Sequence, residues 1–205
     1  MTAIAGVVLA GGRSSRMAGA AKATLELAGV SLVELVVARL RPQVSEVVVN
    51  FNGDPASLPR MPGVAVVADP VAGHPGPLAG VVCAFDYLDL NRSPAEAVAV
   101  VPCDGPFLPA TLVATLAEAL VANAAQAACV RYLGQLQPTF SLWRRDCAPL
   151  ARGELSRGRG GFKSLLAELA AVVVDWPQGE LDPFFNINTP AELAAAQRLV
   201  AAQRH

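Results

Sequence analysis

Short apolar runs recur along the chain up to residue 132 and alternate with longer stretches rich in alanine and leucine. The runs predict β-strands, because they are short and rich in β-branched residues. The predicted strands are 4–10, 46–50, 64–68, 97–101 and 127–132. Between them, apolar residues at helical spacing predict helices over 31–41, 78–90 and 109–123. This alternation is typical of βαβ units and predicts a mostly parallel sheet.

The predicted strands are continuously apolar, whereas a strand with one solvated face would alternate between apolar and polar residues. Continuous apolar character indicates strands that are covered on both faces. The fold class that we expect is therefore α/β, a three-layer α/β/α sandwich with a mostly parallel, Rossmann-like sheet. The chain has 205 residues, with no internal repeat and no long linker, so we expect a single domain.

The pattern changes after residue 132. A strand is predicted over 135–143, "QLQPTFSLW", and its Pro138 favours an edge strand or the start of a strand. Further elements are expected in chain order, two short helices, a strand and a closing helix, over 144–152, 161–169, 170–176 and 189–203.

The closing helix carries its own start signal. Thr189 is expected as the N-cap, with Pro190 in the first turn and Glu192 three residues after the cap.

Composition narrows the function classes. Apolar residues make up 53% and charged residues 16%, which indicates a compact globular protein, and the net charge of -1 argues against nucleic acid as a partner. Four widely spaced cysteines without a CxxC pair argue against a zinc site or a disulfide framework, and each is expected to be a small buried side chain. The chain shows no signal-peptide pattern and no apolar run of about 18 residues. We therefore expect a cytoplasmic protein without a membrane segment.

Candidate chemistry lies where the predicted strands end, since open parallel sheets bind ligands at the carboxyl ends of their strands. The first strand exit, meaning the loop that follows the first predicted strand, is "LAGGRSSRMAGAAK". Its glycines Gly11 and Gly12 allow a ligand to approach the backbone closely, and Arg16 and Lys22 can neutralise the charge of a phosphate. It matches neither a Walker loop nor GxGxxG. The chain has only two lysines but fourteen arginines, so a lysine in this loop goes against the composition and favours a phosphate-binding role for Lys22. The alternative is an ordinary strand-to-helix turn with solvated charges.

Two later exits each offer a carboxylate. Asp104 directly follows the strand 97–101 and "PC", where a hard oxygen ligand is suited to Mg²⁺. The alternative for Asp104 is an N-cap or Asx turn before the next helix. Asp69 ends the third run ahead of Pro70, and a ligand role and a turn-forming role both stay open for it.

Two later segments add polar side chains. In "FFNINTPAEL", Asn186 and Asn188 are two residues apart, so in an extended backbone both side-chain amides face the same side. They are expected either to contact a metal or a phosphate, or to form a turn capped by Asx hydrogen bonds. In "GELSRGRGGFK", three basic residues, Arg157, Arg159 and Lys163, favour either a solvated loop or a grip on a phosphate.

Taken in order, seven segments resemble the molybdenum cofactor guanylyltransferases of the nucleotide-diphospho-sugar transferase superfamily. They are "LAGGRSSRM" with Lys22, "VVVN", "DP", "GPLAGV", "PCDGPFLP", "QPTF" and "FFNINTPAEL". The resemblance spans nearly the whole chain. "PGPLAG" and the "NxNTPxEL" pattern point to the guanylyltransferase branch. One departure is Ala21, where family members often carry an acidic residue before the loop lysine.

The resemblance implies transfer of GMP from GTP to the phosphate of molybdopterin, with release of pyrophosphate. It implies a nucleotide-binding half over about 1–110 and an acceptor-binding half over about 111–205. The nucleotide contacts that it implies are Leu9, Ala10, Gly11, Gly12, Lys22, Asn50, Asp69 and Asp104, with Mg²⁺ on Asp104.

The resemblance further implies catalysis by Arg16, Lys22 and Asp104, and acceptor contacts from Pro138, Thr139, Asn186 and Asn188. Transient contact with molybdenum-insertion proteins and target apoenzymes is implied as well.

The implied chemistry agrees with the residue types present. A phosphate acceptor is already ionised at neutral pH, so alignment and charge neutralisation suffice without a histidine base or an enzyme nucleophile. Two other hypotheses stay open: a related nucleotidyltransferase that uses CTP or UTP on a pterin or sugar phosphate, and a non-catalytic nucleotide-binding or cofactor-delivery protein.

Overall fold

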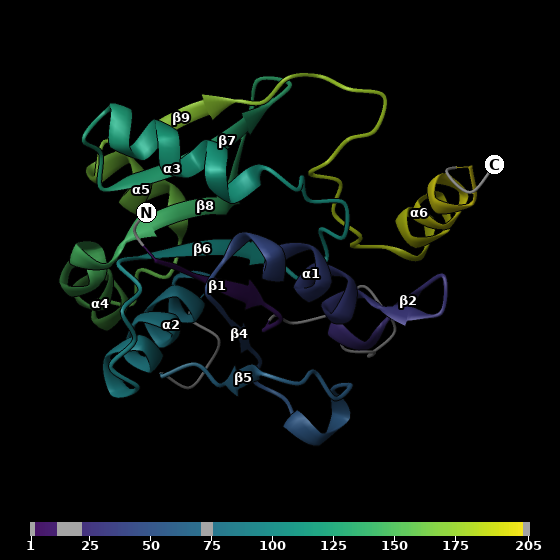
Figure 1. Cartoon of the computed structure of the whole chain (residues 1–205), viewed down its shortest axis with the longest axis horizontal. Coiled ribbons are helices and arrows are strands. Elements are labelled where there is room, and N and C mark those ends of the chain that lie inside the picture. The colour runs from purple at the N-terminus through teal and green to yellow at the C-terminus, as the bar shows by residue number, and fades with distance from the viewer. Residues whose placement is uncertain (1–2, 12–21, 71–75, 203–205) are drawn as a thin grey trace.

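A computed structural model describes residues 3–11, 22–70 and 76–202 (Figure 1). Within these ranges the main sheet has the strand order β5-β4-β1-β6-β8-β7-β9. Its strands, in chain order, are β1 (Ile4–Leu9), β4 (Glu46–Asn50), β5 (Val64–Val67), β6 (Ala97–Pro102), β7 (Ala127–Tyr132), β8 (Gln135–Arg144) and β9 (Val172–Asp175). Every strand predicted from the sequence is present, with ends shifted by up to two residues.

The sheet is mostly parallel, as predicted. Strands β5, β4, β1 and β6 run parallel to their neighbours, and β9 runs parallel to β7. Strand β8 runs antiparallel to both β6 and β7. Because β7 therefore points the same way as β6, the carboxyl ends of five described strands and of β9 share one edge of the sheet.

Helices cover both faces of the sheet, which confirms the three-layer fold class. Buried side chains of α1 and α3 pack on one face, and those of α2, α4 and α5 pack on the other. Helix α6 forms a separate cluster with β2 beyond the sheet edge (Figure 1). The helices are α1 (Leu32–Leu40), α2 (Leu78–Leu90), α3 (Leu112–Ala122), α4 (Ala148–Ser156), α5 (Phe162–Glu168) and α6 (Pro190–Ala202).

The placement of Pro138 corrects one prediction. The residue lies inside β8, an interior strand, rather than at an edge or at a strand start. The β7–β8 register shifts here, from Cys129 opposite Ser141 to Val130 opposite Gln137. Strand β6 pairs with β8 only from residue 141 onward. Pro138 therefore sits in a bulge, where its missing N–H removes no ladder hydrogen bond.

A small hairpin before α1 was not predicted. Strands β2 (Glu26–Leu27) and β3 (Val30–Ser31) are antiparallel, and Ala28 and Gly29 between them have φ values of 56° and 84°. Positive φ at both central residues is the geometry of a two-residue hairpin turn. Strands of two residues are too short to give a periodic signal.

The predicted cap of the closing helix is confirmed. The Glu192 N–H donates to Thr189 Oγ1 at 3.2 Å, and the Glu192 carboxylate accepts from the Asn188 N–H at 2.7 Å. The first bond satisfies a backbone donor that the first turn of the helix leaves open, and the second holds the residue that precedes the N-cap.

The four cysteines are buried, as predicted. Burial raises the pKa of Cys83 and of Cys147 to about 12, so these two thiols stay protonated at neutral pH. In the described part of the chain, no helix combines the length and the apolar character that a membrane crossing requires.

Candidate nucleotide site

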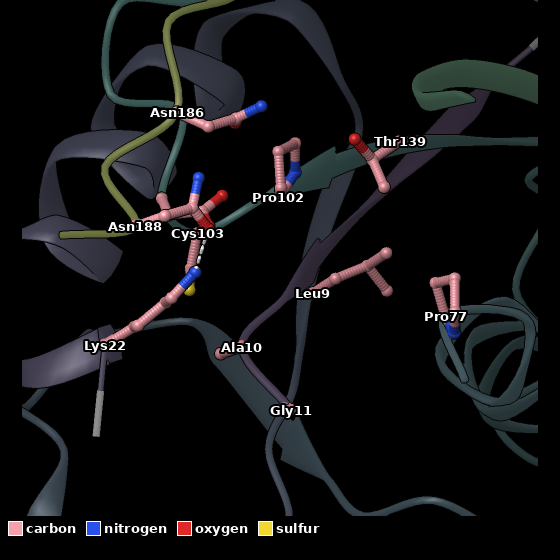
Figure 2. A pocket seen from close by; sticks show the side chains of 11 residues that line it. Leu9, Ala10, Gly11, Lys22, Pro77, Pro102, Cys103, Thr139, Asn186 and Asn188 are labelled. Carbon is pink, nitrogen blue, oxygen red and sulfur yellow. Dashed lines mark hydrogen bonds and ion pairs between the residues drawn. The ribbon is translucent and has the colours of Figure 1, made fainter. Parts of the chain in front are cut away.

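A cavity of about 270 Å³ opens at the carboxyl ends of β1 and β6 (Figure 2). Its lining residues come from the two ends of the chain and from its middle. Its described lining is Leu9, Ala10, Gly11, Lys22, Pro77, Pro102, Cys103, Asp104, Thr139, Asn186 and Asn188. Eight of these residues were predicted as site residues from the sequence.

Lys22 and Asp104 form the charged centre of the cavity. The Lys22 ammonium donates to Asp104 Oδ2 at 2.8 Å, and it also donates to the side-chain oxygen of Asn188. The side chains of Lys22 and Asp104 are 24% and 15% exposed, so the ion pair is only partly screened by water. The Asp104 side chain therefore acts as a partner of Lys22 and not as the N-cap of α3, whose N-cap is Thr111.

Asp104 is positioned by the turn that follows β6. Its carbonyl accepts from the Ile187 N–H at 2.8 Å, which ties the segment of Asn186 and Asn188 to this turn. At the next residue, Gly105, a Cβ atom would lie 2.6 Å from the ring of Phe140, so only glycine allows this close approach. Figure 2 shows Asn186 and Asn188 entering the cavity from the same stretch of chain, as predicted for extended backbone.

The opposite wall is the end of β1. Leu9, Ala10 and Gly11 follow one another along the cavity, opposite Lys22 (Figure 2). The Leu9 carbonyl accepts from the Cys103 N–H at 3.0 Å, and the Ala10 N–H donates to the Asn50 carbonyl at 2.9 Å. These bonds continue the sheet pairing of β1 with β6 and β4 beyond the strand end.

The second and third strand exits meet in a polar cluster beside Gly11, formed by Asn50, Asn52 and Asp69. Asn50 Nδ2 donates to Asp69 Oδ1 at 2.9 Å, and Asn52 Nδ2 donates to Asp69 Oδ2 at 2.6 Å. Asn52 Oδ1 accepts from the Asp69 N–H at 2.7 Å. Asn50 and Asp69 were predicted, but Asn52 was missed. The sequence feature that could have identified Asn52 is its position in the loop "NFNGD" after the second strand, two residues after Asn50.

The described lining of the cavity does not include every predicted residue. Pro138 is outside the described cavity lining, although its neighbour Thr139 is part of it. Gly12, Arg16 and Ala21 lie outside the described residues.

The basic loop is paired within its own segment. Arg157 NH1 donates to Glu154 Oε1 at 3.0 Å, and the Arg159 guanidinium donates to both oxygens of the same carboxylate. Glu154 is buried, and the hydrogen bond from Arg159 lowers its pKa. Lys163 is exposed on α5. Both arginine side chains remain more than half exposed while they pair with Glu154, and the choice between a solvated loop and a grip on a phosphate stays a prediction.

The donor set of the cavity suits a hard cation held largely by substrate oxygens. Among the described residues, no three His, Cys, Asp or Glu side chains come together as a complete metal-binding group. Asp104 offers a carboxylate, and Asn186 and Asn188 offer amide oxygens beside it. Asn186 Oδ1 is buried without a hydrogen-bond partner. Such a set fits Mg²⁺, which keeps several waters and takes one or two carboxylates plus phosphate oxygens.

Comparison with known proteins identifies the family. Residues 6–172 match the family described as the MobA-like NTP transferase domain. The chain belongs to this family. A curated relative from Rhodopseudomonas palustris (strain BisB5), named molybdenum cofactor guanylyltransferase, is 41% identical over 194 residues, which cover 94% of this chain and 92% of the relative. A relative of the same name from Bradyrhizobium sp. (strain ORS 278) is 38% identical and covers 98% of this chain and 95% of the relative.

Solved structures of lower identity share the fold of this family member. Molybdopterin-guanine dinucleotide biosynthesis protein A from Archaeoglobus fulgidus superposes with a TM-score of 0.75 at 22% identity, covering 97% of this chain and 99% of that one. The 4-diphosphocytidyl-2C-methyl-D-erythritol synthase of Anaerococcus prevotii reaches 0.73 at 13% identity, covering 98% and 96%. At these identities the likeness supports the nucleotide-diphospho-sugar transferase fold.

Proposed function

We propose that the protein transfers GMP from GTP to the terminal phosphate of molybdopterin, releasing pyrophosphate and forming a guanine dinucleotide cofactor. The observation that carries the proposal is the pairing of Lys22 with Asp104 and Asn188 in one cavity at the strand ends. The near full-length relatives named molybdenum cofactor guanylyltransferase support the choice of substrates.

The residues divide between nucleotide and acceptor. In this proposal Leu9, Ala10 and Gly11 offer backbone groups to the base, and Asn50 and Asp69 complete the base side. Thr139, Asn186 and Asn188 face the acceptor, as does the segment around Pro138. The nucleotide half then spans about residues 1–110 and the acceptor half about 111–205.

Lys22 and Asp104 act on the triphosphate. Lys22, with its compact charge on a flexible stem, moves from Asp104 to the phosphates when GTP binds. Asp104 is thereby free to hold Mg²⁺, with Asn188 as a further oxygen donor. Mg²⁺ held there would supply positive charge that offsets the negative charge of the α-phosphate and of the departing pyrophosphate. Arg16 adds a second cation from the first loop.

The reaction requires little proton transfer by the protein. The attacking phosphate oxygen of the acceptor is ionised at neutral pH, and pyrophosphate leaves as an anion. The chain's task is to align the two phosphates and to neutralise their charge. We also infer that the finished cofactor passes to molybdenum-insertion proteins and target apoenzymes through transient contacts.

Pyrophosphate release tests the proposal. Purified protein with Mg²⁺ and molybdopterin is offered GTP, ATP, CTP and UTP separately, and the pterin product is identified by mass. We expect release with GTP and a product larger by GMP. Release only with CTP or UTP would assign another nucleotidyltransferase, and GTP binding without product from any acceptor would overturn catalysis.

A further inference from the structure

Asp69 is held by three hydrogen bonds, two to its carboxylate and one from its backbone N–H, and Asn52 takes part in two of the three. The Asn52 amide donates to Asp69 Oδ2 at 2.6 Å and accepts from the Asp69 N–H at 2.7 Å. Both ends of this amide are therefore engaged by the same residue. The third contact, from the buried Asn50, reaches the other carboxylate oxygen at 2.9 Å. Together these bonds fix the plane of the carboxylate.

Neutral amides hold this carboxylate. Among the described residues Asp69 forms no ion pair with a lysine or arginine, in contrast to Asp104, which is paired with Lys22. An ionised carboxylate has about four lone-pair sites. The two amide donors use one site on each oxygen. By this count each oxygen has a further acceptor site.

The cluster lies directly against the cavity wall. A Cβ atom at Gly11 would lie 2.9 Å from Asn52 Nδ2 and 3.3 Å from Asn50 Oδ1. Gly11 itself lines the cavity. The absence of a side chain there lets the backbone of the wall rest on the two asparagines, which places Asp69 beside the part of the wall proposed for the base.

The two acceptor oxygens of a carboxylate match one nucleobase. Guanine presents the adjacent donors N1–H and the 2-amino group along one edge, whereas the edges of adenine, cytosine and uracil mix donors with acceptors that a carboxylate repels. We propose that Asn52 is a positioning residue that sets base specificity, because it orients the Asp69 carboxylate toward the donor edge of guanine. This inference rests on the proposed function and concerns how the same site selects its base.

Comparison of GTP with ITP isolates the effect, because inosine lacks only the 2-amino group. For each variant, kcat and KM are measured by pyrophosphate release with molybdopterin and Mg²⁺. We expect the wild-type protein to prefer GTP over ITP in kcat/KM by about 10-fold or more, the usual size for loss of a hydrogen bond to a charged group. In Asn52→Ala the preference should fall to about 3-fold or less, with the loss in the KM for GTP.

Two further variants separate positioning from general damage. Asn52→Asp keeps the shape but replaces the donor with a charge that repels Asp69, so it should reduce the preference at least as far as Asn52→Ala. Asn123→Ala removes an exposed asparagine that only bonds the Ala119 carbonyl at the end of α3, and it should keep the wild-type preference.

The outcomes are distinct for the two proposals. An unchanged GTP preference in both Asn52 variants, or an equal loss for GTP and ITP, would overturn the role of Asn52 while leaving the guanylyltransferase function intact. Absence of GTP turnover by the wild-type protein would instead contradict the proposed function itself.

Discussion

The ion pair between Lys22 and Asp104 gives a prediction whose size follows from the structure. At an effective dielectric constant of about 20, two unit charges at the observed 2.8 Å attract by about 6 kcal/mol. Most of this offsets the hydration that both groups lose, and their residual exposure weakens the remainder. We therefore expect a net coupling of about 1.5 to 3 kcal/mol in the free protein, the range of a hydrogen bond to a charged group.

A double-mutant cycle measures this coupling. Lys22→Ala, Asp104→Ala and the double variant are unfolded in urea without nucleotide, and the coupling is the part of the change in unfolding free energy that is not additive. The matched control is the pair Arg144–Asp146, which is 3.0 Å long with side chains 51% and 49% exposed. Its coupling should stay below about 1 kcal/mol and fall with added salt.

The same variants test the link to catalysis. Each single variant at Lys22 or Asp104 should lower kcat by about 100-fold or more, since Lys22→Ala removes a cation from the triphosphate and Asp104→Ala removes the carboxylate proposed to hold Mg²⁺. The double variant should lose much less than the product of the two effects, because the residues act as a unit. A coupling no larger than that of the control pair, or normal turnover by Asp104→Ala, would refute the reasoning.

Two further predictions concern the wall and the basic loop. A Cβ at Gly80 would lie 2.4 Å from Leu9 Cδ2, so Gly80→Ala should displace Leu9 and raise the KM for GTP. The control is Gly153→Ala, where the nearest atom to the added Cβ is 3.5 Å away, and its kinetics should be unchanged. Equal kinetics in the two variants would contradict a role for Leu9. The hydrogen bond from Arg159 lowers the pKa of Glu154 below its ordinary value of 4.5. The ion pair therefore stabilises the folded state above pH 4.5, and this stabilisation is lost as the pH falls through the lowered pKa of Glu154. In thermal unfolding Glu154→Gln should therefore lower the Tm at pH 7, and the difference from wild type should shrink toward pH 3; a difference independent of pH would contradict this.

The sequence by itself determined much of the local structure. Apolar runs without polar alternation identified strands buried on both faces, because a doubly covered strand has no solvated side. Thr189 and Glu192 marked the start of the last helix correctly, since an N-cap depends only on residues within one turn. Strand exits likewise pointed to Lys22 and Asp104, because the ends of parallel strands meet at one edge.

Only the tertiary structure decided what depends on distant residues. Asp104 lies 82 positions from Lys22, and Asn188 lies 166 positions from it, so local pattern carries no information on their contacts. The same holds for Pro138, which is tolerated inside β8 because the neighbouring register shifts at that point. Asn52 resembled an ordinary loop residue until the fold brought Asp69 beside it. Local propensity specified the elements, and the pairing of strands and side chains across the sheet specified the site.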